Sequence, residues 1–467
     1  MTDRVHAFTD DALGEYDTVA LAEQVRTGAV SPAELADAAI ARAETVDSRL
    51  HAIVYRPRRP RIAGTDTGVW YGVPAFVKDN ADVAGMPSCH GSAAITPRPA
   101  DKDDRFTAQL LSTGLTVLGK TALPEFGFIS TTEFEHGEPT RNPWDTGYTV
   151  GGSSGGSAAM VAAGVVPVAH GNDGGGSLRI PAACAGLVSL KPSRFRHRDN
   201  AQARQLPIKL VSEGVLTRSV RDQAAYHAAA ERYWRNPKLP PIGAVEGPSD
   251  RPLRIGLLTT AANGREPDAA TAAAVTATAG ILEKAGYVVE PIATPVAASL
   301  VEDFLQYWAF LAQMSGTTGK LGHGRSFDAS RLDPFTRGLA ASFRRRLFAT
   351  PGALYRLNKA RADYDAVLTR HDAILSPVLT HTTPEIGYLN PAVPFPELLE
   401  RVTNFVGYTP VNNVTGSPSI AVPAGLTESG LPVGVMLSGA YGDERTLLEL
   451  AFLLEAENPF PRITTAS

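Results

Sequence analysis

Two glycine-rich clusters that contain serine are the residues of this 467-residue sequence best suited to chemistry. The first is Gly151-Gly152-Ser153-Ser154-Gly155-Gly156-Ser157 and the second is Gly174-Gly175-Gly176-Ser177. Glycine lets the backbone adopt positive φ and lets another group approach it closely. Backbone N–H groups beside a serine can then face a ligand or a developing negative charge. The pattern favours catalysis over packing.

Nucleotide binding by these clusters is disfavoured on two grounds. A Walker A loop ends in Gly-Lys-Ser or Gly-Lys-Thr, and neither cluster contains a lysine. A dinucleotide fingerprint lies between a strand and a helix, whereas residues 142–145 (NPWD), before the first cluster, make a poor strand. The glycines therefore indicate a role other than holding phosphate.

Ser153 also fits the nucleophile elbow Gly-x-Ser-x-Gly of the Ser-His-Asp hydrolases. That interpretation needs a strand before the serine and an acid and a histidine further along the chain. His371 and His381 occur late in the sequence, but their surroundings are ordinary. The elbow is therefore a weaker hypothesis than a serine that is activated without histidine.

A serine can instead be activated by a desolvated lysine, and Lys78 is the best candidate. Lys78 ends the apolar stretch of residues 72–78 (GVPAFVK), where burial would depress its pKa. On spacing alone, a simple ion pair between Lys78 and Asp79 at a strand end is the favoured interpretation. Spacing by itself leaves the catalytic role open.

Three segments taken together resemble the amidase signature family: residues 72–80 (GVPAFVKDN), 151–157 (GGSSGGS) and 171–182 (GNDGGGSLRIPA). Ser177 follows Ser153 by 24 residues, as the resemblance requires. Further matches run from about residue 15 to about residue 455 and include residues 413–418 (NVTGSP) and 430–435 (GLPVGV). The third segment is most similar in form to bacterial amidases related to 6-aminohexanoate cyclic dimer hydrolases and to mycobacterial-type amidases.

The resemblance implies a Ser–Ser–Lys triad, with Ser177 as nucleophile, Ser153 as bridging serine and Lys78 as base. It implies hydrolysis of amide C–N bonds through an acyl-enzyme, with no metal and no cofactor. It also implies an oxyanion hole made by the backbone N–H groups of Gly174, Gly175, Gly176 and Ser177.

Supporting roles are expected for three further residues of these segments. Asp173 and Arg179 are predicted to pair and brace the nucleophile loop, and Ser154 to form a hydrogen bond within its turn. The sequence departs from the common family pattern at Asn172, where Ser or Thr is frequent, and at Gly174, where Thr or Ile is frequent. These departures leave the triad intact and bear on the geometry of the loop.

Composition is that of an ordinary globular protein, with 43% hydrophobic and 20% charged residues and a net charge of −4. No basic face suited to nucleic acid is visible, and no apolar run reaches the ~18 residues of a membrane-spanning helix. Two cysteines, Cys89 and Cys184, exclude a disulfide scaffold and suit a reducing compartment. We therefore expect a cytoplasmic enzyme that takes a small-molecule amide, and a homodimer is left open.

Secondary-structure signals predict an α/β protein. A capping box at Ser31 and Glu34 begins a helix, and residues 71–76 and 115–118 read as buried strands. Strands are also expected at 253–258, 287–289, 373–379 and 419–422, and helices at 157–165, 268–285 and across most of 301–366. Within that last region an aromatic stripe is read as core more than as ligand site: Phe304, Tyr307, Trp308 and Leu311.

The resemblance implies a single large domain over residues 1–467, with a twisted mixed β-sheet covered by α-helices on both faces. Its expected parts are an N-terminal helical segment (about 15–55), a signature core (about 70–225), an α/β and helical pocket region (about 253–370) and a return to the core (about 371–455). Residues 127–136, 301–346 and 404–408 are expected to shape an acyl pocket. Its apolar residues Phe304, Trp308 and Phe405 suggest a hydrophobic or aromatic acyl group.

The function predicted is that of an amidohydrolase acting on linear or cyclic amides. Two alternatives remain at this point. One is an amidotransferase subunit that hydrolyses glutamine and passes ammonia to a partner. The other is a non-catalytic amide-binding protein on the same scaffold, against which the intact Lys78, Ser153 and Ser177 argue.

Overall fold

Lys78 and Asp173 each end a strand of a five-stranded mixed sheet in the computed structural model, which describes residues 3–62, 66–200 and 203–465. Strand β2 runs parallel to β3 and β6, whereas β1 and β8 are antiparallel to their neighbours. In order across the sheet the strands are β1 (Ile53–Tyr55), β3 (Thr116–Thr121), β2 (Pro74–Lys78), β6 (Val168–Asp173) and β8 (Ser212–Thr217).

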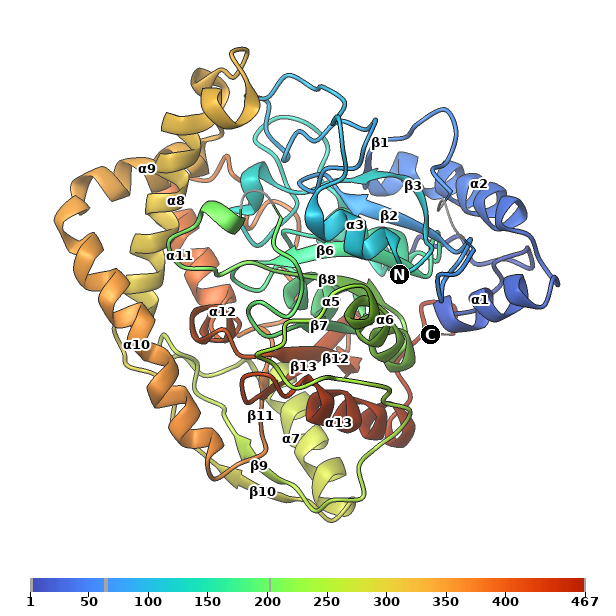
Figure 1. Ribbon diagram of the computed structural model, residues 1–467. Helices are drawn as coiled ribbons and strands as arrows, with labels where there is room; N and C mark the ends of the chain where they lie inside the picture. Colours follow the sequence, from blue (N-terminus) through green and yellow to red (C-terminus); the bar gives the residue numbers. More distant parts are fainter. Residues whose placement is uncertain (1–2, 63–65, 201–202, 466–467) are drawn as a thin grey trace.

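A second, six-stranded sheet continues the first, because a bridge between Val188 and Thr217 joins their edges (Figure 1). The three strands at one end of this sheet, β10, β9 and β11, are parallel to one another, and every pair from β11 through β13 and β12 to β7 is antiparallel. In order they are β10 (Val288–Pro291), β9 (Arg254–Leu257), β11 (Ala373–Pro377), β13 (Pro432–Gly439), β12 (Ser419–Leu426) and β7 (Ser189–Lys191). A separate hairpin pairs β4 (Arg141–Asn142) with β5 (Asp145–Thr149), just before the first serine cluster.

Helices cover both faces of these sheets, as predicted. In chain order they are α1 (Thr18–Arg26), α2 (Pro32–Leu50), α3 (Arg105–Leu111), α4 (Gly155–Ala162), α5 (Arg179–Ala185), α6 (Val220–Tyr233), α7 (Ala269–Lys284), α8 (Leu300–His323), α9 (Pro334–Arg345), α10 (Thr350–Leu368), α11 (Phe395–Phe405), α12 (Pro410–Thr415) and α13 (Glu444–Glu457). Short 3₁₀ helices are η1 (Glu125–Gly127), η2 (Ala203–Gln205), η3 (Ala329–Arg331) and η4 (Leu347–Ala349).

Strand β11 shows how the second sheet is buried on two sides. Ala373 and Leu375 pack in the apolar cluster that includes α7 and α13, whereas Ile374 between them belongs to the cluster that includes α5. Successive side chains of a strand point to opposite faces, so a strand covered on both faces is apolar throughout. The prediction of a mixed α/β fold is confirmed.

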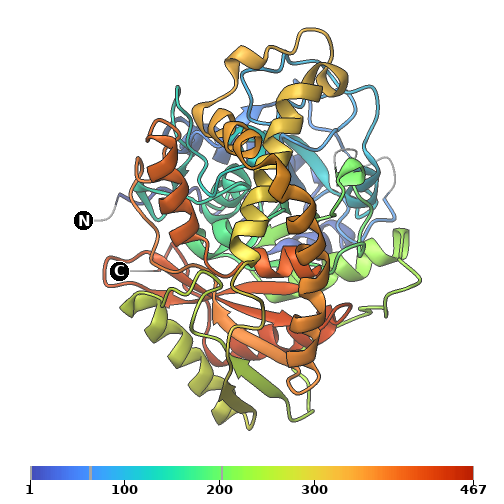
Figure 2. The same ribbon diagram turned by 90° about the vertical axis from the view of Figure 1, so that its left-hand side faces the viewer.

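Three helices form a layer beside the sheets rather than on them. Figures 1 and 2 show α8, α9 and α10 along one side of the molecule, where α8 packs against both α9 and α10. This layer is the helical region predicted for residues 301–366. It brings α8 against the loop of the second serine cluster, where Trp308 would lie 3.2 Å from a Cβ added to Gly174.

Most of the local predictions are confirmed, with shifts at the ends of elements. Ser31 accepts the Glu34 N–H and Glu34 accepts the Ser31 N–H, so the predicted capping box is present. The strand predicted at 71–76 begins only at Pro74, because the left-handed Gly72 (φ +82°) belongs to the preceding turn. Strand β13 was not predicted, although part of it lies in a segment that carries the resemblance.

Candidate active site

Lys78 lies at the end of β2 with its side chain fully buried. Its Nζ atom is 2.7 Å from Ser153 Oγ, 2.9 Å from Ser154 Oγ and 2.8 Å from Asn172 Oδ1. The structure therefore joins Lys78 to the first serine cluster and to strand β6. All three neighbours are uncharged oxygen atoms.

Burial lowers the pKa of Lys78 to about 7, against the opposing attraction of Glu213 and Asp173. His170 lies behind the lysine, where its Nδ1 accepts the Lys78 backbone N–H at 3.3 Å and its Nε2 lies 3.0 Å from Glu213 Oε2. This places the ring proton on Nε2, facing the carboxylate. Glu213 is thus held by the imidazole, and among the described residues the lysine has no carboxylate partner of its own.

The prediction of an ion pair between Lys78 and Asp79 is wrong. Asp79 Oδ1 lies 3.8 Å from Lys120 Nζ on the neighbouring strand β3. Val77 pairs with Lys120 in the β2–β3 register. Asp79 comes two residues after Val77, so its side chain points to the same face of the sheet as Val77 and Lys120. Because the side chains of a strand alternate, Lys78 points to the opposite face.

The first serine cluster connects β5 to α4 and packs tightly against a neighbouring loop. A Cβ on Gly152 would lie 2.6 Å from the carbonyl oxygen of Thr131, so a larger residue would displace the backbone beside Ser153. The Ser154 hydroxyl donates to the Asn172 carbonyl at 3.2 Å and accepts from Lys78, rather than bonding within its own turn as predicted. The Ser154 N–H donates to the Ser177 carbonyl at 3.2 Å, which ties the two clusters together.

Asp173 organises the loop of the second cluster. Its carboxylate accepts the Gly176 N–H at 2.7 Å and the Leu178 N–H at 3.2 Å. Arg179 holds the same carboxylate with two hydrogen bonds of 2.8 and 2.9 Å, so the predicted pair is present. Burial opposes ionisation of Asp173, but the Arg179 guanidinium outweighs it and holds the pKa of this carboxyl well below its usual range.

The four predicted oxyanion-hole amides differ in their hydrogen bonds. Gly176 N–H is engaged by Asp173. Within the described part of the chain, the N–H groups of Gly174, Gly175 and Ser177 donate to no protein acceptor. A Cβ on Gly175 would lie 3.1 Å from the Phe304 ring, so the glycine lets α8 approach the loop closely.

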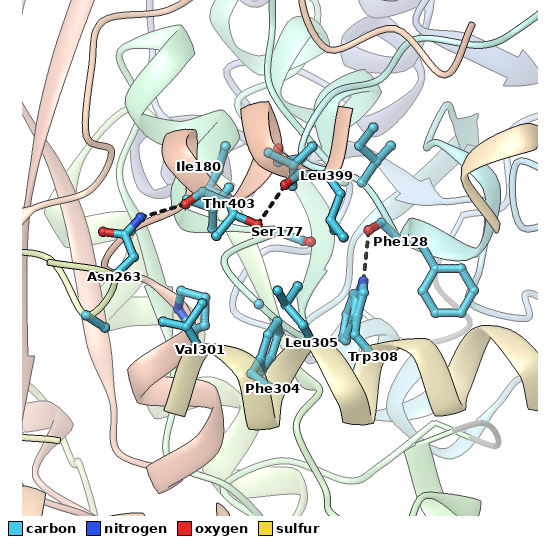
Figure 3. A pocket seen from close by; sticks show the side chains of 18 of the residues that line it. Phe128, Ser177, Ile180, Asn263, Val301, Phe304, Leu305, Trp308, Leu399 and Thr403 are labelled. Atoms are coloured by element: carbon cyan, nitrogen blue, oxygen red, sulfur yellow. Dashed lines mark hydrogen bonds between the residues drawn. The ribbon is translucent and has the colours of Figure 1, made fainter. Parts of the chain in front are cut away.

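A largely apolar cavity opens beside Ser177, with an empty volume of about 750 Å³ including its mouth (Figure 3). Its walls come from the loop after η1, the second serine cluster and the start of α5, residues 262–263, helices α8, α9 and α11, and the start of α12. The lining residues are Gly127, Phe128, Ile129, Ser130, Gly175, Ser177, Ile180, Ala262, Asn263, Leu300, Val301, Phe304, Leu305, Trp308, Phe335, Leu399, Val402, Thr403, Val406, Gly407, Pro410 and Val411.

Polar groups of the cavity wall are mostly bonded to one another. Trp308 Nε1–H donates to the Phe128 carbonyl at 2.9 Å, Asn263 Nδ2–H donates to the Thr403 carbonyl at 2.9 Å, and the Thr403 hydroxyl donates to the Leu399 carbonyl at 2.7 Å. Figure 3 shows Phe304 and Trp308 rising from α8 toward Ser177. They line the cavity, although the stripe they belong to was read as core.

Phe405 is not part of the cavity wall, contrary to expectation. Its side chain is buried, and its ring packs 4.9 Å from that of His381. The two late histidines have other partners, since His371 Nε2 lies 2.8 Å from Glu290 and His381 Nδ1 lies 2.8 Å from the Thr382 carbonyl. The partner of the Ser153 hydroxyl is Lys78, so the elbow hypothesis has no histidine to support it.

Two asparagines of the site were not predicted. Asn172 contacts Lys78, and sequence reasoning noted it only as a departure from the family pattern. Asn413 Nδ2–H donates to the Asp173 carbonyl oxygen and carboxylate at 2.8 and 2.9 Å, and its Oδ1 accepts from Arg179 at 2.7 Å. Asn413 lies in the segment 413–418 (NVTGSP), whose match to the family was the available signal.

Within residues 3–62, 66–200 and 203–465, no three His, Cys, Asp or Glu side chains are arranged to hold a metal ion. Over the same residues, no helix has the length and apolar character needed to cross a membrane.

Comparisons with known proteins show which family the chain belongs to. The family profile described as Amidase matches residues 34–448. A Mycobacterium tuberculosis protein named "Putative amidase AmiC" is 48% identical over 466 residues, which cover 98% of this chain and 98% of its own. The 6-aminohexanoate-cyclic-dimer hydrolase of a Pseudomonas species is 33% identical over 488 residues, or 95% of each chain.

A solved structure extends the likeness to the fold. The structure of a 6-aminohexanoate cyclic dimer hydrolase complexed with substrate matches 98% of this chain and 99% of its own, with a TM-score of 0.84 and 28% identity. The fold and the relatives define the class of protein as an amidohydrolase of mixed α/β architecture that acts on amide C–N bonds. The chain belongs to the amidase family.

Proposed function

We propose that Ser177 is the nucleophile of amide hydrolysis and that Ser153 and Lys78 are its proton relay. The observation that carries this proposal is the 2.7 Å distance between Lys78 Nζ and Ser153 Oγ, at a lysine whose pKa burial lowers to about 7. A large fraction of such an amine is uncharged at neutral pH and can accept a proton. Ser177 lines the cavity, so its hydroxyl is the one that substrate reaches.

The proposed reaction runs through an acyl-enzyme. Ser177 Oγ attacks the amide carbonyl carbon while its proton passes to Ser153, whose own proton passes to neutral Lys78. The C–N bond then breaks as Ser153 returns a proton to the leaving nitrogen and Lys78 returns one to Ser153. Water attacks the Ser177 ester through the same relay, which releases the carboxylic acid and restores the enzyme.

The oxyanion hole is proposed to consist of the N–H groups of Gly174, Gly175 and Ser177. Gly176, which belonged to the predicted set, braces the loop through its bond to Asp173 instead. Losing one such donor typically costs ~3 kcal/mol of transition-state stabilisation. The Asp173–Arg179 pair supports this arrangement by fixing the loop that carries the donors.

The substrate group that fills the cavity is proposed to be apolar and uncharged. Within the described residues, no Asp, Glu, Lys, Arg or His side chain lines the cavity. A charged group would lose its hydration there without gaining a partner. An aliphatic or aromatic group would gain roughly 25 cal/mol for each Å² of apolar surface that it buries against residues such as Phe304 and Trp308.

The same cavity disfavours the glutamine-hydrolysing alternative, because glutamine carries an ammonium and a carboxylate group. A non-catalytic amide-binding protein is disfavoured by the lysine–serine contact, which simple binding does not require. Relatives named as 6-aminohexanoate-cyclic-dimer hydrolases make uncharged cyclic amides a second group of compounds to test.

The test is hydrolysis by the purified protein of a panel of linear and cyclic amides with aliphatic, aromatic or charged acyl groups, with glutamine included. We expect uncharged apolar amides to be cleaved and glutamine to be left intact. Ser177→Ala is the control and is expected to lose the activity. Full activity of that variant, or cleavage of glutamine alone, would contradict the proposal.

Two coarser features are proposed on sequence evidence. A cytoplasmic location is supported by the free thiols of Cys89 and Cys184, and cell fractionation tests it. The homodimer that the sequence leaves open is tested by light scattering of the purified protein. Neither feature enters the chemistry of the site.

A further inference from the structure

The neighbours of the Lys78 nitrogen restrict the direction of its lone pair. A neutral amine has two N–H groups and one lone pair, whereas an ammonium group has three N–H groups. Three oxygen atoms surround this nitrogen at 2.7 to 2.9 Å. In the neutral state, therefore, two of them accept from the amine and the third donates to it.

Two of the three neighbours can only accept. Asn172 Oδ1 is a carbonyl oxygen and has no proton to donate. The Ser154 hydroxyl already donates to the Asn172 backbone carbonyl at 3.2 Å, so its oxygen presents lone pairs to the lysine. The remaining neighbour, Ser153 Oγ, is the atom whose O–H can meet the amine lone pair.

The Asn172 amide is itself held in place by a second amide. Asn172 Nδ2–H donates to Asn80 Oδ1 at 3.1 Å, and Asn80 Nδ2–H donates to Asn172 Oδ1 at 3.3 Å. Asn80 lies two residues after Lys78, so the chain segment that carries the base also carries the group that orients its partner. The Asn172 side chain is buried, which keeps water from competing for these bonds.

We propose that Asn172, paired with Asn80, is a positioning residue that takes one N–H of neutral Lys78 and so directs the amine lone pair at Ser153. Ser154 takes the other N–H. The inference rests on the proposed function, because it concerns the orientation of the base in that relay. It also predicts that an acid at this position would act differently from an amide, because a carboxylate here would hold the lysine as ammonium.

Other charged and titratable groups around Lys78 are already balanced by partners of their own. They come from β2, β3, β6 and β8, and they are Asp79, Lys120, His170, Asp173 and Glu213. Asp79 faces Lys120, Asp173 faces Arg179, and Glu213 faces His170. A new carboxylate at position 172 would be the first to contact the Lys78 nitrogen directly.

The experiment is the pH dependence of kcat/KM for Asn172→Asp, measured with an amide that the wild-type enzyme cleaves. An opposite charge in contact raises a lysine pKa by about 1–3 units. The acidic limb of the profile should move to higher pH by that amount. At pH 7 kcat/KM should then be about 5- to 500-fold lower than in the wild type, and it should recover at alkaline pH. An unmoved limb would overturn the inference.

Asn172→Leu is the matched variant, because it removes the acceptor without adding charge. We expect it to lower kcat at every pH, while the acidic limb of its pH profile does not move to higher pH.

If Asn172→Asp fails to fold, Asn80→Ala is the test. A lower kcat at unchanged KM supports the inference, and an unchanged kcat overturns it. Full activity of Lys78→Met would contradict the proposed function itself. If Lys78→Met is inactive and the acidic limb of the Asn172→Asp profile is at the wild-type pH, only this inference is contradicted.

Discussion

Two buried lysines on neighbouring strands, Lys78 on β2 and Lys120 on β3, have opposite surroundings. Lys120 donates to the Ala81 carbonyl at 2.7 Å and to Ser88 Oγ at 2.9 Å, and it faces Asp79. Lys78 contacts two serine hydroxyls and an amide, with no carboxylate beside it. Burial lowers the pKa of both lysines. Asp79, which faces Lys120, opposes this shift there, whereas the carboxylates that oppose it at Lys78, Glu213 and Asp173, are paired with His170 and Arg179.

Under the proposed function, this difference separates a structural lysine from a reactive one. A buried lysine that keeps a carboxylate partner stays charged and holds its surroundings together. A buried lysine with neutral partners can lose its proton near neutral pH and serve as a base. The substitutions below test this contrast, from the largest expected effect to the smallest.

Lys78→Met should lower kcat by about 10²–10⁴-fold, the usual contribution of a general base. The variant should fold and be at least as stable as wild type at pH 7, because the substitution removes a buried amine. Folded Lys78 loses its proton near pH 7 and an unfolded lysine near pH ~10.4, so wild-type stability rises with pH between these values. The advantage of the variant in chemical denaturation should therefore shrink toward pH ~10.

Lys120→Met should show the reverse, with a loss of stability and little change in kcat per folded molecule. Removing one partner of a buried ion pair typically costs about 3–5 kcal/mol, here because Asp79 is left without its cation. Denaturation curves and active-site titration of the soluble fraction measure the two quantities separately. A stable Lys120→Met enzyme with no activity would remove the contrast between the lysines.

The wild-type pH profile of kcat/KM should have an acidic limb near pH 7. Protonation of Lys78 removes the base, so activity should fall about tenfold per pH unit below that value and level off above it. A partially active Lys120 variant, such as Lys120→Arg, should keep the same limb. A limb near pH 4 or near pH 10 would assign the base to another group.

The smallest effect is expected in the cavity, away from both lysines. Leu305→Ala should raise KM for an apolar amide by roughly 10-fold, because it removes apolar contact with the bound group. Leu321→Ala on the same helix is the matched control, since Leu321 is 91% exposed. Equal effects of the two substitutions would show that α8 acts through stability rather than by contacting substrate.

The residues proposed for the site could be named from the sequence because each stands in a local pattern. Glycines beside Ser153 and Ser177, and an apolar run ending at Lys78, are each visible within about ten residues. The orientation of Lys78 away from Asp79 follows from strand alternation, but its partners depend on which strands meet. The Lys78–Asn172 contact joins residues 94 apart in the chain, which no local pattern encodes.

Apolar periodicity also cannot separate core from cavity wall, because both require apolar side chains. Tyr307 and Trp308 belong to the same predicted stripe, yet Tyr307 is buried whereas Trp308 lines the cavity. Phe405 was assigned to the pocket on its type alone and packs against His381 instead. The single domain expected over residues 1–467 stays a prediction.

The most direct test of the account is the rate at which a fluorophosphonate probe modifies Ser177 as a function of pH, followed by mass spectrometry of the peptide. We expect one adduct, on Ser177, with a rate that falls below pH 7 in the wild type and is low at every pH in Lys78→Met. An adduct on Ser153, or the same pH-dependent rate in Lys78→Met, would contradict the claim that buried Lys78 activates Ser177.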